Sequence, residues 1–418
     1  MDLPVATDVD VIVAGAGPAG AVAARTLAAA GLRTVIVDRA EFPRNKPCGG
    51  GISVRATRRF PWLRAVLDRI DVHQIARLRL EGPAGTSLDI RADDPCVLLI
   101  RRVEFDNALL GTAIEAGAEL ISRFEVTQVT TTNERVTLQA RDGRHISAPH
   151  VIAADGVHSV IAKRTDVNPR WPRTRLAIDM MEETPASVLR AERPNELWVA
   201  YAYEGLDGYA YIFPKMHHVN VGIGCLLSHF DEHVSEQPYA LQQRFVSTLV
   251  ERGVLHGRSD KASFTPFLIP VGGPLERTWQ GRVLYAGDAG GFVHAVTAEG
   301  IYYAMVSGEL AGRAVVDACR SATARSAGQA YERAWRAELG AELQDAVYVQ
   351  RYLFSSHERV ASVVRSAAAL PGLTDLLLRF VRGDISYKVL RRRMIWRFPM
   401  SILRMTRERM GGRHVAAM

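Results

Sequence analysis

The fold is decided by a strand-like run, VDVIV at Val9–Val13, followed closely by the glycine-rich segment GAGPAG at Gly15–Gly20. An alanine-rich stretch at residues 21–30 comes next, and a second apolar run, TVIV at Thr34–Val37, ends in Asp38. Short continuous runs of β-branched residues are typical of buried parallel strands. The order of strand, glycine turn, helix, strand and acid predicts the first βαβ unit of a dinucleotide-binding domain.

Each glycine of this unit has a separate task in the predicted fold. Gly15 makes the tight turn, Gly17 lets the backbone approach a pyrophosphate, and Gly20 lets the helix pack closely on the strand. The first turn of the helix, at Ala19, then faces the phosphates with free amide donors. Asp38 stands where a carboxylate accepts hydrogen bonds from ribose hydroxyls. NAD and FAD enzymes share this unit, so the motif alone leaves both dinucleotides open.

Length and composition indicate an ordinary globular protein. The 418 residues suit two or three domains, and the 48% apolar and 23% charged content is far from that of disordered chains. Four cysteines lie far apart without metal-ligand spacing, which predicts a reduced cytoplasmic protein with no structural metal. No signal peptide is expected, and no window reaches the roughly 18 apolar residues of a membrane-spanning helix.

The net charge of +7 is concentrated near the C-terminus. Residues 379–413 carry eleven basic and two acidic residues, so the rest of the chain is slightly negative and a nucleic-acid partner is not expected. The pattern predicts basic helices that either form a solvated cap or contact a membrane surface or an acidic partner. The apolar residues of this tail include Met394, Ile395, Phe398, Ile402 and Leu403.

Four further segments carry more specific patterns. They are KPCGGG at Lys46–Gly51, DG at Asp155–Gly156, YAYIFP at Tyr209–Pro214, and GDAGGF at Gly287–Phe292, which continues through TAEGI at Thr297–Ile301. Three consecutive glycines permit the backbone to pack closely against a flat ring. Alternating aromatic residues on a strand point to one face, where they either line an apolar pocket or pack a sheet against a core.

With these segments the chain resembles the geranylgeranyl reductase family, a branch of the flavoproteins that share the para-hydroxybenzoate hydroxylase fold. The resemblance covers most of residues 8–315. It implies FAD as the cofactor, with the KPCGGG loop beside the isoalloxazine ring and the DG and GD motifs near the pyrophosphate and the ribityl chain. Together with the βαβ unit it implies these cofactor-binding residues: Gly15, Gly17, Ala19, Gly20, Asp38, Arg39, Cys48, Gly49, Gly50, Arg102, Asp155, Gly156, Gly287, Asp288, Gly300 and Ile301.

The resemblance also implies a substrate side of the site. The YAYIFP segment is similar to the family's YxWxFP signature, and the substrate-binding residues that it implies are Tyr209, Tyr211, Phe213 and Pro214. Cys48 and His294 are the candidate catalytic residues, each as a proton donor. An ordinary histidine pKa suits proton delivery near neutral pH. The alternatives for Cys48 are a wall on the substrate side or a core position, and the alternative for His294 is a surface or hydrogen-bonded loop histidine.

Several positions depart from the family pattern. Tyr211 stands where the family has Trp, which suggests a substrate other than a plain polyprenyl lipid. Ala295 and Ala298 stand where Pro and Gly are common, and this leaves the shape of the active-site loop open. Lys163 stands where Arg is common, so a bidentate contact is not expected there.

The expected fold class is α/β, with a discontinuous Rossmann-type FAD-binding domain, an antiparallel β-sheet substrate domain and a helical C-terminal region. The FAD-binding domain is assigned to residues 1–75, 97–165 and 278–325. The substrate domain takes residues 76–96 and 166–277, and the helical region with the basic tail takes residues 326–418.

The expected activity is that of an FAD-dependent oxidoreductase, which reduces a carbon–carbon double bond of a hydrophobic isoprenoid or natural-product substrate with electrons from NAD(P)H or another donor. Reduced flavin also reacts with oxygen, so the alternative is a flavin-dependent monooxygenase, a hydroxylase or epoxidase of a tailoring pathway. A halogenase is not favoured because the chain has no WxWxIP motif. A noncatalytic flavin-binding or membrane-associated scaffold is a further alternative, against which the complete cofactor motifs argue.

Overall fold

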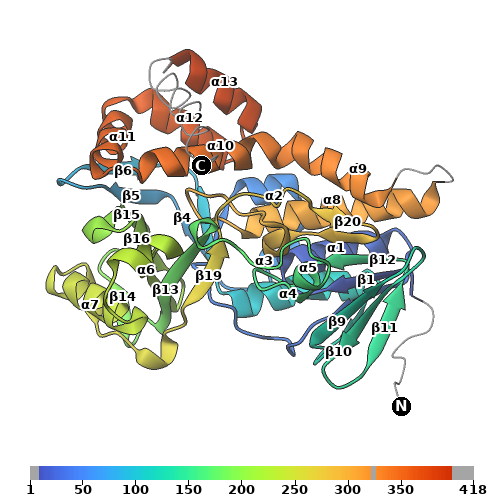
Figure 1. Cartoon of the computed structure of the whole chain (residues 1–418). Helices are drawn as coiled ribbons and strands as arrows, with labels where there is room; N and C mark the ends of the chain where they lie inside the picture. Colours follow the sequence, from blue (N-terminus) through green and yellow to red (C-terminus); the bar gives the residue numbers. More distant parts are fainter. Residues whose placement is uncertain (1–8, 322–325, 398–418) are drawn as a thin grey trace.

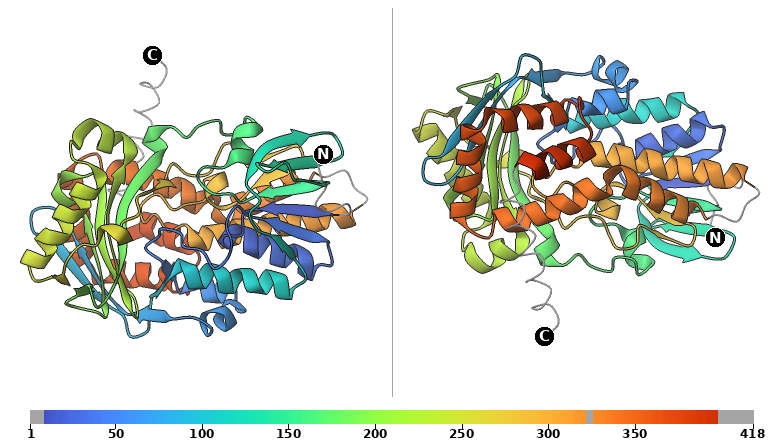
Figure 2. Two further views of the ribbon diagram at one scale, coloured as in Figure 1. Left: turned by 90° about the horizontal axis from the view of Figure 1, so that it is seen from below. Right: turned by 90° about the horizontal axis from the view of Figure 1, so that it is seen from above.

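Two β-sheets stand at opposite ends of the molecule, with the C-terminal helices along one side of both (Figure 1). The structure is a computed structural model that describes residues 9–321 and 326–397. The two further views in Figure 2 show the same separation of the sheets. The chain therefore forms two sheet-based domains that share a helical side.

The dinucleotide-binding domain is built on a six-stranded sheet of order β20-β21-β12-β1-β2-β8, parallel except at β20. All four residues of β1 and of β2 are buried, as their continuous apolar sequences predict. The strands are β1 (Val11–Ala14), β2 (Thr34–Val37), β8 (Glu119–Ile121), β12 (His150–Ala153), β20 (Trp279–Gln280) and β21 (Val283–Tyr285).

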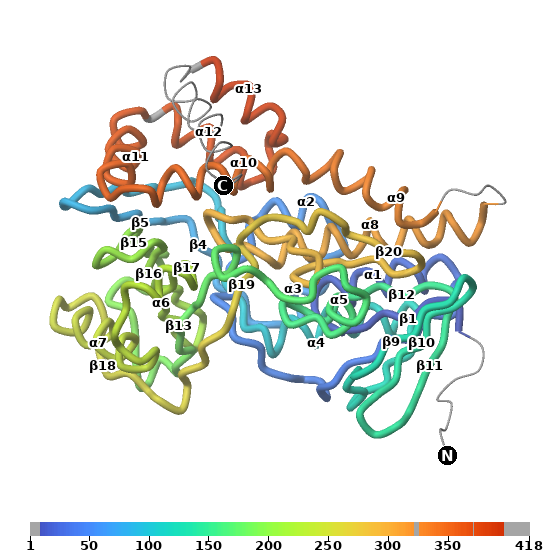
Figure 3. The backbone as a smooth tube through the Cα atoms, viewed as in Figure 1, coloured from blue at the N-terminus to red at the C-terminus, as the bar shows by residue number. Residues whose placement is uncertain are grey.

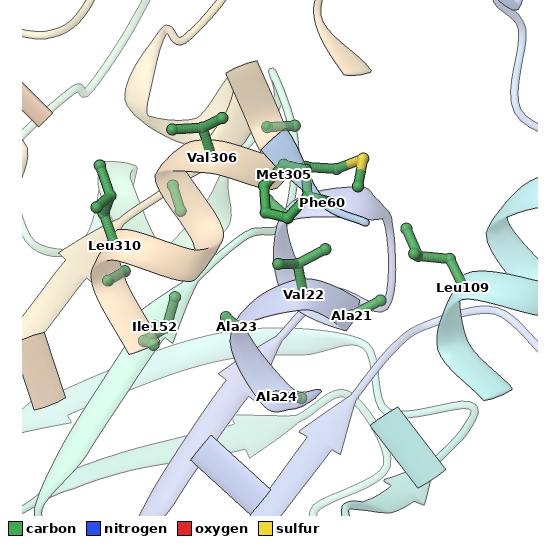
Figure 4. Close-up of a cluster of buried hydrophobic side chains, with 14 of the residues drawn as sticks. Ala21, Val22, Ala23, Ala24, Phe60, Leu109, Ile152, Met305, Val306 and Leu310 are labelled. Carbon is green, nitrogen blue, oxygen red and sulfur yellow. The ribbon is translucent and has the colours of Figure 1, made fainter. Parts of the chain in front are cut away.

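Helices α1 (Pro18–Ala29), α4 (Arg102–Glu115) and α8 (Ile301–Arg320) enclose the main hydrophobic core with one face of this sheet. Figure 4 shows part of that core, where Val22 of α1 lies among Phe60, Leu109 and Met305. The opposite face is covered by a three-stranded sheet, whose strands are β9 (Val126–Thr131), β10 (Val136–Ala140) and β11 (His145–Ala148), and by the short helix α5 (Val160–Arg164).

Helices α1 and α8 pack so closely that their backbones touch. A Cβ atom on Gly308 would lie 2.1 Å from the carbonyl oxygen of Ala19, and one on Gly312 would lie 3.0 Å from that of Ala23. Because both contacts advance by four residues in the same direction, the two helices run parallel. Their N-termini therefore lie at the same end of the pair.

The second domain is a seven-stranded sheet of order β19-β13-β17-β16-β15-β5-β6. Helices α6 (Leu227–His233) and α7 (Pro238–Glu251) belong to its outer side, where α7 packs a second core against the sheet. The strands are β5 (Arg77–Glu81), β6 (Ser87–Arg91), β13 (Leu176–Pro185), β15 (Glu196–Tyr201), β16 (Gly208–Pro214), β17 (His218–Leu226) and β19 (Phe267–Pro270).

The expectation of a purely antiparallel sheet is wrong at one pair, because β15 runs parallel to β5. A hairpin connection forces neighbouring strands to be antiparallel. The hairpin of β5 and β6 instead reaches the sheet from a distant, N-terminal part of the chain, so its direction is not constrained by a turn. Figure 3 shows these blue strands beside the green strands β15 and β16.

The remaining short elements form two further small sheets and two short helices. One of these sheets has three strands in the order β3-β7-β4, and the helices α2 and α3 lie between β3 and β4 in the sequence. In the other sheet β14 pairs with β18, next to the core that α7 forms on the outer side of the seven-stranded sheet. Their bounds are β3 (Gly51–Ser53), α2 (Arg55–Arg59), α3 (Leu63–Leu67), β4 (Val72–Ile75), β7 (Val97–Ile100), β14 (Leu189–Ala191) and β18 (Leu255–Gly257).

The C-terminal region is helical, and α11 packs against β6 of the second sheet. Its helices are α9 (Ala327–Trp335), α10 (Ala341–Leu353), α11 (His357–Ala369), α12 (Pro371–Val381) and α13 (Tyr387–Arg397), with a π-helical turn (Arg336–Gly340) between α9 and α10. No single described helix is both long and apolar enough to cross a membrane; α11 and α12 reach that length only as a pair, bent by 97°.

The basic tail is described only in part. Within α13, Met394 is half-buried, whereas Ile395 and Trp396 are 41% and 78% exposed. Phe398, Ile402 and Leu403 lie outside the described residues. The predicted contact of the tail with a membrane surface or an acidic partner therefore stays a prediction.

The contact between α1 and α8 predicts the effect of a single methyl group. We expect Gly308→Ala to lower the free energy of unfolding by about 1–3 kcal/mol, because the new Cβ meets backbone and not a flexible side chain. The urea midpoint measures this change. Gly111→Ala in α4 is the control: nothing lies within 4 Å of its Cβ position, so alanine should raise the midpoint. A Gly308→Ala midpoint at or above the wild-type value would contradict the packing.

Candidate active site

The glycine-rich turn after β1 is shaped by a positive φ and two close approaches. Gly15 has a φ of +101°, and a Cβ atom there would lie 2.3 Å from the carbonyl oxygen of Ala154. A Cβ atom on Gly20 would lie 1.7 Å from the carbonyl oxygen of Gly15. Both positions therefore require glycine. Asp38 at the end of β2 holds the turn, because its Oδ2 accepts a hydrogen bond from the amide of Ala16 at 2.7 Å.

The other oxygen of Asp38 accepts the amide of Ala40 at 2.8 Å. Each carboxylate oxygen can accept a second hydrogen bond, so a contact of Asp38 with a ribose stays a prediction. Arg39, beside it, is exposed. The tertiary structure thus adds to Asp38 a local task, anchoring the turn, that the sequence motif did not reveal.

Helices α1 and α8 both begin without a side-chain cap, at Gly17 and Gly300. Neither helix has an acidic residue in its first turn. Their first amide groups are therefore available to an external anion or carbonyl oxygen, which the helix dipole also favours. The pairing of Gly308 with Ala19 offsets the two termini by six residues, or about 9 Å along the helix axes.

The GD and KPCGGG segments meet at the start of α8. Asp288 lies in a 3-10 turn, Gly287–Gly290, and its Oδ2 lies 3.9 Å from Nζ of Lys46. Its Oδ1 would lie 3.6 Å from a Cβ atom on Gly300. Two segments that are far apart in the sequence are therefore brought together at the start of α8, whose first residue is Ile301.

The DG segment lies beside the glycine-rich turn. Asp155 is half-buried, and desolvation of its carboxyl raises the pKa above the usual value. Its Oδ2 accepts the amide of Ile161 at 3.3 Å, while its Oδ1 has no hydrogen-bond partner among the described residues. Gly156 follows with a φ of +84°. An orphaned buried oxygen at this edge of the sheet fits a site that takes a polar ligand.

Arg102, at the start of α4, is buried and forms a bidentate pair with Asp106, with both N–O distances at 2.7 Å. Arg44 contacts the same carboxylate at 2.9 Å. Arg102 also interacts electrostatically with the thiol of Cys48. Its guanidinium is therefore held by protein partners beside the KPCGGG loop, which places it near the candidate site without showing a cofactor contact.

The KPCGGG loop packs directly against the aromatic residues of β16. A Cβ atom on Gly49 would lie 2.9 Å from the ring of Phe213, and one on Gly50, whose φ is +74°, would lie 2.1 Å from the carbonyl oxygen of Ile100. The Sγ atom of Cys48 accepts the amide of Gly50 at 3.3 Å. The loop and the aromatic strand therefore form two walls of one site.

The three aromatic residues of β16 share one sheet face, as their alternation predicts. The ring centroids of Tyr209 and Tyr211 are 6.0 Å apart, and those of Tyr211 and Phe213 are 4.6 Å apart. The hydroxyl of Tyr209 donates to the carbonyl oxygen of Thr297 at 2.8 Å. That bond joins the second domain to the loop before α8. Pro214, the end of the segment, is buried.

The hydroxyl of Tyr211 has a different partner, which sequence analysis missed. It donates to Oδ2 of Asp179 on β13 at 3.0 Å. Asp179 is 6% exposed, and its burial raises the pKa of the carboxyl to about 7, although the bond from Tyr211 opposes this shift. A signal was present: Asp179 is the only charged residue in the run LAIDMM at residues 176–181.

Lys215 is a second residue that sequence analysis missed. It follows β16, its side chain is 2% exposed, and it forms an ion pair with Glu183. A Cβ atom on Gly50 would lie 2.9 Å from its Nζ atom. Burial lowers the pKa of Lys215, and Glu183 partly offsets this effect. The lysine therefore places a cation next to Gly50 of the KPCGGG loop. The sequence signal for it was its position directly after Phe213 and Pro214.

His294 lies in the loop before α8, but the expectation of a pKa suited to neutral pH is wrong. Burial and the nearby Arg55 guanidinium lower the pKa of its imidazole to about 3. Its Nδ1 accepts the amide of Thr297 at 3.3 Å, and its ring stacks on Tyr303 at 6.0 Å. At neutral pH His294 is therefore an uncharged, hydrogen-bonded group, and its catalytic role stays a prediction.

Arg55, which lowers that pKa, belongs to a buried polar network behind the loop. Its Nη1 contacts Glu342 at 2.8 Å, its Nη2 donates to the hydroxyl of Tyr303 at 2.7 Å, and Glu299 lies 3.5 Å away. Glu299 in turn accepts the hydroxyl of Ser53 at 2.8 Å. The network ties the loop before α8 to β3 and to α10.

The departure from the family pattern at Ala298 has a backbone consequence. Ala298 has a φ of +51°, in the left-handed region that a residue with a Cβ atom adopts at a cost of about 1–2 kcal/mol. Ala295, the other departure, is buried, and its carbonyl oxygen accepts Nε2 of Gln350 at 2.8 Å. The loop before α8 thus keeps at Ala298 a backbone conformation that glycine would adopt more easily. The hydrogen bond from Gln350 ties this loop to α10.

This geometry can be set beside known proteins. The family described as FAD binding domain matches residues 8–337. Digeranylgeranylglycerophospholipid reductase 1 of Methanopyrus kandleri is 32% identical over 346 residues, which cover 79% of this chain and 86% of the relative. The chain belongs to the geranylgeranyl reductase family of FAD-dependent oxidoreductases. This flavoprotein is accordingly an enzyme.

Solved structures show that the fold is shared more widely than the activity. The flavoprotein superposes on a geranylgeranyl bacteriochlorophyll reductase-like protein from Thermoplasma acidophilum with a TM-score of 0.76, at 20% identity, over 95% of this chain and 98% of that one. A flavin-dependent brominase follows with a TM-score of 0.69, at 16% identity, over 90% and 94% of the two chains. At these identities the likeness concerns the fold alone.

The described residues fit FAD on physical grounds. Two uncapped helix N-termini, about 9 Å apart along parallel axes, would hold the pyrophosphate at Gly17 and an electron-rich edge of the flavin at Gly300. The backbone at Gly17 is open, since only Nη2 of Arg44, at 3.5 Å, approaches its Cβ position. Asp288 and the backbone of the KPCGGG loop would complete the cradle.

The open space at Gly17 predicts a variant that separates folding from cofactor binding. Gly17 has a φ of −73°, which any residue adopts, so Gly17→Val should fold normally and yet block the approach of the pyrophosphate to the backbone. We expect the thermal midpoint to stay near the wild-type value while bound FAD, measured by flavin absorbance, falls severalfold.

Gly111→Ala, in a helix with nothing near its Cβ position, is the control and should keep its FAD. Gly15→Val is a poorer test, because its positive φ and the contact with Ala154 would also damage the fold. Full FAD occupancy in folded Gly17→Val would rule out the assigned phosphate site.

Proposed function

We propose that this flavoprotein reduces a carbon–carbon double bond of a hydrophobic isoprenoid or natural-product substrate, with NAD(P)H or another electron donor. Bound FAD supplies the hydride for such a reduction. The observation that carries the proposal is the face of the seven-stranded sheet that packs against the KPCGGG loop. This face combines an apolar wall with a few polar groups, as expected for a site that binds and orients a hydrophobic molecule.

The apolar wall belongs to a distinct cluster that the seven-stranded sheet forms with the β3-β7-β4 sheet. Its buried members are Ile75, Leu99, Met181, Leu197, Val199 and Tyr211, with Tyr209, Phe213 and Phe267 packed against them. Tyr209, Tyr211 and Phe213 are the proposed substrate-binding residues, with Pro214 ending the strand. Aromatic and aliphatic side chains here would exclude water from an alkene and hold its chain.

The relative from Methanopyrus kandleri supports the same class of reaction, since its name describes reduction of an isoprenoid lipid. The phenol hydroxyls of Tyr209 and Tyr211 add polarity that a wall built only of hydrocarbon would lack. We therefore propose a substrate that carries at least one polar group beside its reducible chain.

A flavin-dependent monooxygenase is the second candidate function. The fold that this flavoprotein shares with a brominase shows that the architecture also serves oxidative chemistry. The two candidates differ in the product, because reduction adds two hydrogen atoms whereas oxygenation adds one oxygen atom. Product mass therefore decides between them.

The product experiment uses the holoenzyme. We expect anaerobic reduction of the flavin by NADPH, NADH or dithionite, followed by geranylgeraniol or a digeranylgeranylglycerophospholipid, to give a product heavier by two hydrogen atoms per reduced bond. Heat-treated holoenzyme is the control. A product formed only in air and heavier by one oxygen atom would replace the proposal with the monooxygenase.

Cys48 is tested by its closest isostere. We expect Cys48→Ser to keep its FAD but to lower turnover or alter the product distribution, because the thiol lies in the KPCGGG loop beside Arg102 and the aromatic strand. Cys319→Ser is the matched control, since Cys319 is exposed at the far end of α8. Steady-state kinetics and product analysis measure the change. Unchanged values in both variants would reduce Cys48 to a packing residue.

A further inference from the structure

One cross-strand row of the seven-stranded sheet carries a carboxyl group into the apolar wall. Asp179 of β13 stands between Phe267 of β19 and Gly224 of β17, and Gly224 stands opposite Tyr209 of β16. Side chains of one row share a sheet face, so Asp179 lies on the same face as the aromatic residues. A single carboxyl group therefore interrupts an otherwise uncharged row.

Asp179 lines a cavity between this sheet face and the loop before α8. The other walls come from Tyr209, from Ala295, Val296 and Ala298 of the loop, and from Phe354 after α10. Among all the described residues that line it, only Asp179 and Asp207 carry a carboxyl group, and none carries a cation. The cavity therefore offers an acid without a counter-ion, directly beside the loop that precedes α8.

Two glycines of β17 make room for this arrangement. A Cβ atom on Gly222 would lie 2.4 Å from the Cζ atom of Tyr211, so a side chain there would displace the phenol. A Cβ atom on Gly224 would lie 3.5 Å from Oδ1 of Asp179. The phenol of Tyr211 thus lies across Gly222 and reaches the carboxyl of Asp179 from the neighbouring row.

The hydrogen bonds distinguish the two oxygens of Asp179. Oδ2 accepts the hydroxyl of Tyr211 at 3.0 Å, whereas Oδ1 is buried and has no partner among the described residues. When the carboxyl is protonated, its proton therefore belongs on Oδ1, because Oδ2 is already occupied by a donor. The phenol also stabilises the carboxylate that remains after the proton has left.

The surroundings of Asp179 keep a substantial fraction of the protonated acid near neutral pH. Burial raises its pKa to about 7 against the opposing bond from Tyr211. The titratable groups that face it or share its cavity are Tyr209, Tyr211, Cys225 and Asp207, and Asp207 is paired with His229 at 3.3 Å. β19 contributes Phe267, over whose ring lies Lys46, itself 3.9 Å from Asp288.

A second carboxyl group on the same strand shows how neighbouring cations change the pKa of a buried acid. Glu183 is four residues from Asp179 and is also largely buried, which by itself raises its pKa, but Lys215 and Arg101 reverse the shift and lower it. The two carboxyl groups are thus driven in opposite directions. Such separation is typical of sites in which one carboxyl acts as an acid and the other stays ionised.

We propose that Asp179 is the proton donor of the reduction and that Tyr211 is the residue that positions it. This proposal deepens the proposed function and rests on it. The alkene accepts a hydride, with its two electrons, at one carbon; its π electrons take the proton from Oδ1 at the other carbon. The O–H bond breaks, its electron pair stays on the carboxylate, and solvent restores the proton between turnovers.

The test follows single-turnover reoxidation of the pre-reduced holoenzyme by geranylgeraniol without oxygen, between pH 5 and 9. We expect the wild-type rate to fall as pH rises through about 7, because the donor is then ionised. Asp179→Asn, which is isosteric but carries no acid proton, should be slower by about 100-fold or more and should lose this pH dependence. Its FAD content and substrate affinity should stay near wild-type values.

Tyr211→Phe provides a second, independent reading. This substitution removes the hydrogen bond that favours the carboxylate form of Asp179, so the pKa of Asp179 should rise. The falling limb of the pH–rate profile, where the rate drops as Asp179 ionises, should then move to higher pH. A purely structural role for Tyr211 would change affinity or stability but would leave the limb in place. Phe264→Leu, in the core on the outer side of the sheet, is a control that should keep the wild-type limb.

The outcomes separate the two proposals. If the wild type reduces none of the alkene probes, the proposed function fails and the assignment of Asp179 fails with it. If the wild type reduces geranylgeraniol but Asp179→Asn matches its rate and pH profile, only the assignment of Asp179 is overturned. Infrared titration of the holoenzyme adds a readout without turnover. Burial also raises the pKa of Glu182 to about 7, so Asp179→Asn should lose only part of the protonated carboxyl absorbance that titrates near pH 7, and an absorbance equal to that of the wild type would also overturn the assignment.

Discussion

The parallel packing of α1 on α8 is the constraint on which the site depends. Backbone contact at Gly308 and Gly312 brings the two helices closer than side chains would allow. Because the helices are parallel, their uncapped N-termini open at the same end, and the offset along the axes separates them by about 9 Å. Two positive helix ends that open at the same end of the pair favour a ligand with two electron-rich groups, as in FAD.

The second sheet completes the site because its glycines make room for large side chains. Gly222 and Gly224 remove two side chains from the middle of the sheet face, and the phenol of Tyr211 occupies the space over Gly222. Tyr209 then connects the sheet to the loop before α8 through the carbonyl oxygen of Thr297. The cofactor and substrate walls are therefore held together by specific hydrogen bonds as well as by apolar packing.

The charges within the site depend on which partners each buried group has. Arg102 and Lys215 are buried cations with carboxylate partners on the side of the KPCGGG loop, whereas Asp179 is a buried acid without a cation on the side of the cavity. Burial alone disfavours any charge, so the partner decides which groups stay ionised. Burial, together with the nearby Arg55 guanidinium, keeps His294 neutral.

The sequence by itself determined the dinucleotide-binding unit, because the positive φ of Gly15, the contact of Gly20 with the carbonyl oxygen of Gly15 and the apolar runs around them are all set within residues 11–37. It also indicated the aromatic face of β16, since alternation along a strand is a local property. The pairing of β5 with β15, the bond from Tyr211 to Asp179 and the low pKa of His294 were decided only by the tertiary structure. Each depends on which distant residues surround a given group: burial and neighbouring charges set a pKa, and the paired strand sets a strand direction, so neither follows from the residue's own sequence context.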